Sequence, residues 1–219
     1  MIQIKTAKMY NMDCMDFMAD IPDNYYDLAC VDPPYGIGKD GGKIGGGNCG
    51  KAKNYTKKDW DKTPPPQEYF NELLRVSKHQ IIFGANHFIS RIPFDSSCWI
   101  VWDKDNTGNF ADCELAWTSF DTAVRKFQWR WNGMLQQNMK DKQERIHPTE
   151  KPIQLYYWIY HNYLPQGGKV IDTHAGSQSN TIAALKAANI EIDAIELDKE
   201  YYNKSVQRVK DFAAQLTMF

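Results

Sequence analysis

Short apolar runs alternate along the chain with longer stretches in which apolar residues recur every three or four positions. Runs typical of buried strands occur at residues 26–31, 79–84, 99–102, 115–118, 125–131, 169–172 and 192–196. Helical spacing covers residues 64–76, 86–92, 152–163, 179–188 and 199–216. The alternation of strands and helices predicts an α/β fold with a mixed, mostly parallel sheet and helices on both faces.

One long segment, residues 36–63, carries neither pattern. It is rich in glycine and lysine, and a structureless stretch of this length in a compact domain is usually functional or mobile. No internal repeat or linker divides the chain. We therefore expect a single domain over residues 1–219, with a mobile Gly/Lys-rich loop at 36–63.

The composition narrows the class of protein. The chain has 219 residues and a net charge of −1, so it lacks the bulk positive charge of a protein that coats nucleic acid, although a local basic patch is compatible with it. No apolar run approaches the roughly 20 residues that span a membrane. The five cysteines form no Cys-x-x-Cys pair and the five histidines no metal-binding spacing. We expect reduced thiols, a cytoplasmic location, no membrane contact and no metal.

The most specific chemical signal is the tetrapeptide Asp32-Pro33-Pro34-Tyr35, directly after the apolar run 26–31. It therefore follows the end of a parallel strand, where open α/β sheets bind their ligands. Two prolines donate no backbone N–H, so the turn is stiff and its carbonyls can accept hydrogen bonds. A carboxylate, a free carbonyl and an aromatic ring in one turn suit a planar ligand with an amino group. By itself the motif could also be a plain strand-ending turn.

A second pattern of carboxylates lies towards the C-terminus. Asp172 ends a predicted strand and precedes a turn with Gly176 and Ser177, and Glu196 ends the next strand. This spacing is typical of an adenosine-binding βαβ unit, in which the second acid binds the ribose hydroxyls. Taken singly, each acid is better explained as a helix N-cap or an exposed strand end than as a binding residue. As a spaced pair they favour a nucleoside site.

Two phosphate-binding patterns in the glycine-rich loop are rejected. Residues 36–41 match G-x-G-x-x-G, but more glycine follows where a helix would have to begin. Residues 45–51 approach a P-loop, but Ala52 stands where Ser or Thr would hold Mg²⁺. The loop is better interpreted as a basic segment that closes over a phosphate backbone, or equally as a solvated lysine-rich loop.

Together these motifs resemble the amino-group DNA methyltransferases that use S-adenosylmethionine. The tetrapeptide at 32–35 matches their catalytic Asp-Pro-Pro-Tyr, and its position before the cofactor motif resembles the permuted, beta-type branch. Residues 147–152 resemble the His-Pro-Thr-x-Lys-Pro segment beside the methionine part of the cofactor, and residues 11–14 resemble the Gly-Asp-Cys element near its adenine. The resemblance covers nearly the whole chain and implies a Rossmann-like methyltransferase fold.

The resemblance also implies a set of cofactor-binding residues, and the cofactor loop departs from the family pattern. The implied residues are Asp13, His147, Thr149, Lys151, Asp172, Gly176, Ser177 and Glu196. In the loop, Thr173-His174 replaces Pro-Phe and Gln178-Ser179 replaces Gly-Thr. Gln178 is unfavourable if the backbone there takes a conformation reserved for glycine.

The chemistry follows from the catalytic motif, for which we expect Asp32, Pro33, Pro34 and Tyr35 to act together. An exocyclic amine is a poor nucleophile because its lone pair is delocalised into the ring. If Asp32 and the Pro33 carbonyl accept its two hydrogens, the lone pair localises and can attack the sulfonium methyl group. Tyr35 would stack on the base, which must first be flipped out of double-stranded DNA. We expect neither a metal nor a covalent intermediate.

Recognition of the target is expected within residues 103–145, which mix basic residues with tryptophans. The candidate DNA contacts, in this segment and in the loop, are Lys39, Lys51, Lys53, Arg125, Arg130 and Arg145. A solvated hairpin with core tryptophans is an equal alternative for this segment. So short a region fits a short recognition site or a second subunit, which leaves a homodimer open.

Asp at the first motif position goes mainly with adenine in the family that the chain resembles, so we expect site-specific methylation of adenine N6. Cytosine N4 is the alternative within that family. RNA or protein-glutamine methyltransferases are disfavoured, because they usually carry Asn there and place the cofactor motif first. A catalytically weakened DNA-binding relative is the third alternative, and the altered cofactor loop suggests it.

Overall fold

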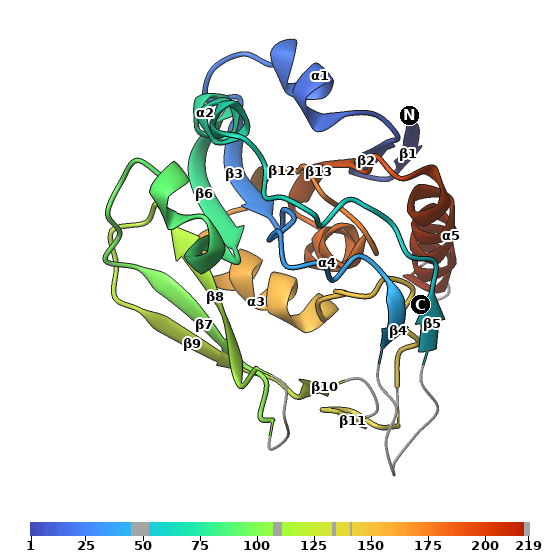
Figure 1. The fold of residues 1–219 in the computed structure, drawn as a ribbon. Helices are drawn as coiled ribbons and strands as arrows, with labels where there is room; N and C mark the ends of the chain where they lie inside the picture. Colours follow the sequence, from blue (N-terminus) through green and yellow to red (C-terminus); the bar gives the residue numbers. More distant parts are fainter. Residues whose placement is uncertain (45–52, 107–110, 133–134, 141, 217–219) are drawn as a thin grey trace.

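The computed structural model describes residues 1–44, 53–106, 111–132, 135–140 and 142–216, and its centre is a nine-stranded sheet (Figure 1). The strands, in their order across the sheet, are β1 (Ile2–Ile4), β2 (Ala7–Tyr10), β13 (Ile190–Ile195), β12 (Gly168–Asp172), β3 (Tyr26–Val31), β6 (Ser77–Phe83), β8 (Cys113–Thr118), β7 (Trp99–Asp103) and β9 (Arg125–Gln128). The run from β2 to β6 is parallel, whereas β8 is antiparallel to both β6 and β7. The prediction of a mixed, mostly parallel sheet is confirmed.

Helices cover both faces of this sheet (Figure 1). The first face packs against α1 (Cys14–Ala19) and α2 (Gln67–Val76); the second packs against α3 (Ile153–Tyr163), α4 (Ser179–Ala187) and α5 (Lys199–Leu216). Alternate residues of β3 serve the two layers, because Ala29 and Val31 join the first and Leu28 and Cys30 the second. Burial on both faces explains why this strand is a nearly continuous apolar run in the sequence.

The site is positioned by the neighbouring strands β3 and β12. They pair in parallel, with Ile171 opposite Ala29. The chain leaves β3 towards α2 on one face, and it leaves β12 for α4 on the other. Such a reversal opens a crevice beyond the carboxyl ends of the strands, where open α/β sheets bind ligands.

Some local elements differ from the sequence-based expectation. The helix predicted at 86–92 is two single 3-10 turns, Ala85–His87 and Ile89–Arg91, because Phe88 between them leaves the helical region (φ −145°). Part of the loop 36–63 pairs as β4 (Gly42–Ile44) and β5 (Lys53–Tyr55). Within the target segment, β10 (Trp131–Asn132) and β11 (Leu135–Gln136) form a separate ribbon. The single-domain organisation and the mobility of the loop remain predictions.

The described part of the chain contains no helix that is long and apolar enough to cross a membrane. Nor do its residues form a group of three or more His, Cys, Asp or Glu side chains that could hold a metal ion.

Candidate active site

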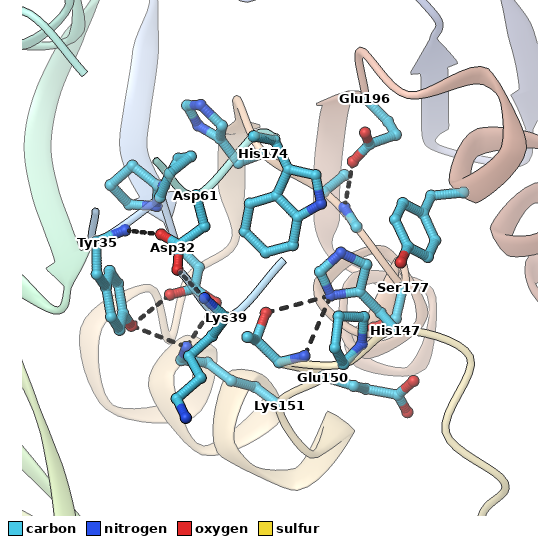
Figure 2. Close-up of a pocket in the computed structure, with 18 of the residues that line it drawn as sticks. Asp32, Tyr35, Lys39, Asp61, His147, Glu150, Lys151, His174, Ser177 and Glu196 are labelled. Atoms are coloured by element: carbon cyan, nitrogen blue, oxygen red, sulfur yellow. Dashed lines mark hydrogen bonds and ion pairs between the residues drawn. The ribbon is translucent and has the colours of Figure 1, made fainter. Parts of the chain in front are cut away.

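A cavity of about 1620 Å³ opens beyond the carboxyl ends of β3, β12 and β13. Most of the residues predicted for catalysis and cofactor binding line it: Asp13, Asp32, Pro33, Pro34, Tyr35, His147, Thr149, Lys151, Gly176, Ser177 and Glu196. Asp32 and Tyr35 lie on one side of this cavity and Glu196 and Ser177 on the other (Figure 2). One ligand of ordinary size fills about 300–1,000 Å³, so the cavity has room for two.

The predicted catalytic turn, residues 32–35, and the residues after it are held by a carboxylate from the far end of the loop 36–63. Asp61, which is buried, accepts hydrogen bonds from the backbone N–H of Tyr35 and Gly36 (both 2.8 Å) and of Lys39 (2.7 Å). These three donors would otherwise lack partners in a turn without secondary structure. Asp61 therefore fixes the path of the chain after Pro34. Sequence reasoning missed it, because a lone Asp in a glycine- and lysine-rich loop belongs to no motif.

The ring of Tyr35 is held against the end of β6. It stacks on the His87 ring, with 5.1 Å between centroids and 16° between planes. Its hydroxyl donates to Oδ1 of Asp32 at 2.6 Å. Gly84 makes room for the ring, because a Cβ there would lie 2.1 Å from its Cε1 atom. Gly84 also has a φ of +66°, so both its backbone and the ring beside it favour glycine.

Asp32 belongs to a buried chain of alternating charges. The Nζ atom of Lys151 lies 2.5 Å from Oδ2 of Asp32 and 3.2 Å from Oε2 of Glu114, and Glu114 also pairs with Lys104. Burial raises the pKa of Asp32, although Lys151 opposes that shift. Burial also disfavours ionisation of Glu114, yet the two lysines lower its pKa to about 2. The resemblance implied a cofactor contact for Lys151; the structure places it against Asp32, the carboxylate predicted to be catalytic.

The two acids of the nucleoside pattern hold the cofactor loop. Glu196 accepts the backbone N–H of Gly176 and of Asp198, both at 2.8 Å, and burial raises its pKa to about 7. Asp172 accepts from the backbone N–H of His174 and from the Asn180 side chain, and burial raises its pKa to about 7. Glu196 lines the cavity, whereas Asp172 lies beneath the loop and supports it.

Residues 147–151 form a further part of the cavity wall. The His147 ring packs between Trp60, at 5.3 Å, and Tyr201, at 4.4 Å between centroids. Burial lowers the pKa of His147 to about 3, so the ring is neutral at physiological pH. Arg208 of α5 joins this wall to the cofactor loop, since it donates to the Ser177 carbonyl at 2.8 Å and pairs with Glu150 at 3.0 Å.

A family model described as DNA methylase, with N6 and N4 members, matches residues 96–207 of the chain. The chain belongs to the N6/N4 DNA methylase family. Its relatives include YubD of Escherichia coli (strain K12), a protein named as a methylase, which is 26% identical over 223 residues and covers 90% of this chain and 87% of that protein. The type II methyltransferase M2.MboI of Moraxella bovis is 22% identical over 252 residues, with 94% of this chain and 91% of that protein covered.

Among solved structures, the M1.HpyAVI–SAM complex superposes with a TM-score of 0.58. It covers 92% of this chain and 99% of that one at 18% sequence identity, which bears on the fold alone. The Rossmann-like methyltransferase fold predicted from the sequence is confirmed. Members of the family transfer a methyl group from S-adenosylmethionine to an exocyclic amine of DNA, on adenine N6 or cytosine N4. The chain is a DNA amino-methyltransferase in this sense.

The predicted cofactor loop of this DNA methylase contains a residue in the left-handed conformation. Gln178 takes the left-handed conformation (φ +61°, ψ +24°) that relatives fill with glycine. This costs a side chain about 1–2 kcal/mol. The Gln178 side chain is fully buried, and the Thr181 hydroxyl donates to its Oε1. Gln178 is therefore accommodated in the loop at the cost of this strain.

The predicted DNA contacts fall into three groups. Lys39, at the cavity, and Arg125, on β9, have exposed side chains. Arg130 pairs with Asp105, and Arg145 packs on the Trp131 ring at 4.9 Å while donating to the Trp131 carbonyl at 2.7 Å. The third group cannot be placed: Lys51 lies outside the described residues, and of Lys53 only the backbone, in β5, is described. Among the candidates whose side chains are described, Lys39 and Arg125 are exposed, whereas the charges of Arg130 and Arg145 contact neighbouring residues.

Proposed function

We propose that this methylase transfers the methyl group of S-adenosylmethionine to N6 of a flipped adenine at specific sites in double-stranded DNA. The observation that carries the proposal is the shared cavity, which has Asp32 in one wall and Glu196 in the opposite one. A donor held at Glu196 and a base held at Asp32 would meet inside it. Holding two reactants in line can supply several kcal/mol of the barrier reduction.

The residues around the cavity fit the cofactor. Glu196 would accept hydrogen bonds from the ribose hydroxyls, and Gly176 and Ser177 leave backbone beside it for close approach. Trp60 lines the same cavity, and its Nε1–H group is buried and has no hydrogen-bond partner among the residues that the structure describes. This group would donate to an acceptor such as the cofactor carboxylate. His147, Thr149 and Asp13 complete the proposed set, and Asp172 supports it from below. When bound, the cofactor supplies an electrophilic methyl group on sulfur.

The catalytic turn would activate the target amine. Asp32 accepts one amine hydrogen and the Pro33 carbonyl accepts the other, since Pro33 and Pro34 donate no backbone N–H that would compete. The nitrogen lone pair then points at the methyl group. Flipping the base costs a few kcal/mol, and stacking of the base on Tyr35 would return about 1–3 kcal/mol. No protein group has to become covalently attached to the substrate.

The choice of adenine rests on Asp32, because Asp at this position goes mainly with adenine in the family. Lys39 and Arg125 are proposed to contact phosphates, since their charged ends are exposed. A contact of this kind contributes to affinity and its loss reduces the salt dependence of binding.

Labelled methyl transfer onto unmethylated duplex DNA, RNA and protein tests the proposal. Incorporation into DNA, followed by digestion to nucleosides and mass identification of N6-methyladenine, is the expected result. N4-methylcytosine as the main product would correct the base, and label in RNA or protein would correct the substrate. Cofactor binding, followed through tryptophan fluorescence because Trp60 lines the cavity, must accompany any of these outcomes.

A further inference from the structure

We infer that Lys151 is a positioning residue that keeps Asp32 ionised and oriented towards the target amine. The inference rests on the proposed function, because it assigns Asp32 to the amine. Lys151 lies outside the catalytic tetrapeptide, in the segment that the sequence assigned to the cofactor. Its ammonium group meets Asp32 at 2.5 Å and the Tyr35 hydroxyl at 3.1 Å (Figure 2).

The ammonium group of Lys151 is buried among the groups with which it pairs. Its side chain is 3% exposed and that of Asp32 is 17% exposed. Its three donors are directed at Asp32, Glu114 and Tyr35, all within 3.2 Å. Taking an ammonium out of water costs several kcal/mol, so this burial is tolerated because both carboxylates compensate it.

Glu114 and Lys104 complete the charge balance around Lys151. Because Glu114 pairs with Lys104 as well, the four groups alternate in sign and their charges sum to zero. Among the residues that the structure describes, the other titratable groups that interact with Asp32 are Asp172 at the end of β12, Tyr35 and Cys30 beside it in the chain, Tyr69 of α2 and Tyr156 of α3. None of these carries a positive charge. Lys151 is therefore the cation that offsets Asp32.

The charge on Asp32 decides what it can do for the amine. An ionised carboxylate only accepts hydrogen bonds, and each oxygen keeps a lone pair beyond its bond to Tyr35 or Lys151. A protonated Asp32 would present a donor to the amine and lose one acceptor. Without Lys151 the pKa of Asp32 would rise, because burial would act on it unopposed. A smaller fraction of the protein molecules would then carry the ionised Asp32 that methyl transfer needs at neutral pH.

The test compares the pH dependence of kcat in the wild type with that of Lys151→Met, Lys151→Arg and Lys104→Met. Loss of Lys151 should move the acid limb to higher pH by about one unit or more, the usual effect of removing an adjacent opposite charge. Lys151→Arg, which keeps the charge, should retain most of the wild-type position. Lys104→Met removes a charge of the same chain that contacts Glu114 and not Asp32; its acid limb should move less than that of Lys151→Met.

A second measurement on ligand-free protein separates this inference from the proposed function. Melting temperatures of Asp32→Asn, Lys151→Met and the double variant form a cycle. Each single change removes one side of the contact between Asp32 and Lys151, so if the two charges are coupled the double variant should lose less stability than the sum of the two single losses. Additive losses would overturn the charge coupling even if DNA is methylated.

Failure of the proposed function gives a result that differs from failure of the charge coupling. If the melting temperatures show that Asp32 and Lys151 are coupled but the wild-type protein methylates no DNA, the proposed function is overturned. The role of Lys151 in turnover is overturned with it. A Lys151→Met variant that is folded, binds S-adenosylmethionine many-fold more weakly and keeps its acid limb would overturn the inference. In that case Lys151 would be a cofactor-binding residue, as the sequence resemblance implies.

Discussion

Replacing Gly84 by alanine should displace the ring of Tyr35 from the catalytic turn. The new Cβ atom would lie 2.1 Å from Cε1 and 2.3 Å from Cζ of that ring, distances that real Cβ contacts do not show. The ring cannot keep both its stack on His87 and its hydrogen bond to Asp32 after such a shift. Gly38 provides a matched control, because its φ of +68° is nearly the same as the +66° of Gly84 and a Cβ there meets nothing within 4 Å.

The expected magnitude follows from what each variant loses. Both pay about 1–2 kcal/mol for a side chain in the left-handed region. Gly84→Ala also loses a hydrogen bond to a charged group, about 1.5–3 kcal/mol, and an aromatic stack, about 0.5–1.5 kcal/mol. Gly84→Ala should therefore be less stable than Gly38→Ala by about 2–4 kcal/mol. In a domain of this size that difference lowers the melting temperature by on the order of 10 °C.

Thermal melts and single-turnover methylation of the two variants are the assays. Turnover should fall at least about tenfold in Gly84→Ala, since a 1.4 kcal/mol rise in the barrier already gives that factor. Cofactor affinity should change little, because Gly84 does not line the cofactor side of the cavity. Equal melting temperatures and equal turnover in the two variants would refute the claim that Gly84 makes room for the Tyr35 ring in its contacts with His87 and Asp32.

Three further predictions concern the supports of the site. Burial raises the pKa of Glu196 in the folded state from its ordinary 4.5 to about 7, so folding favours the protonated carboxyl. The contribution of Glu196 to stability is therefore present at low pH and is lost as the pH rises to about 7. Glu196→Gln should therefore gain roughly 2–3 kcal/mol over the wild type between about pH 5 and pH 8 in urea unfolding, and a constant difference contradicts this. Asp61→Asn should cost about 1.5–3 kcal/mol and reduce turnover while leaving cofactor affinity intact, and unchanged turnover argues against its role. Arg208→Met should weaken cofactor binding at least about tenfold in a fluorescence titration, and an unchanged Kd contradicts the link through α5.

The central part of the fold could be predicted because its signals are local. Buried strands such as β3 and β12 are short apolar runs that end in a carboxylate, and the α2 stripe at Tyr69, Phe70, Leu73 and Val76 has the period of a helix. The position of the site followed from these strand ends. The edge strand β1 and its neighbour β2 were missed, since they are three and four residues long and half polar.

The supports of the site could not be predicted, because they join residues far apart in the chain. Lys151 and Tyr35 are 116 positions apart, and Asp61 reaches back 26 positions to the Tyr35 amide. No periodicity connects such residues, and an isolated Lys or Asp has many uses. The resemblance assigned Lys151 to the cofactor because of its motif, whereas packing brought its charge to the nearest buried carboxylate.

Turnover and cofactor affinity of Asp32→Ala, measured on one preparation, test the central claim most directly. The claim is that Asp32 acts on the target amine and not on the cofactor. The account predicts that methyl transfer to duplex DNA falls to background while the dissociation constant for S-adenosylmethionine stays close to that of the wild type. Near-normal turnover in Asp32→Ala, or a loss explained wholly by weaker cofactor binding, would contradict it.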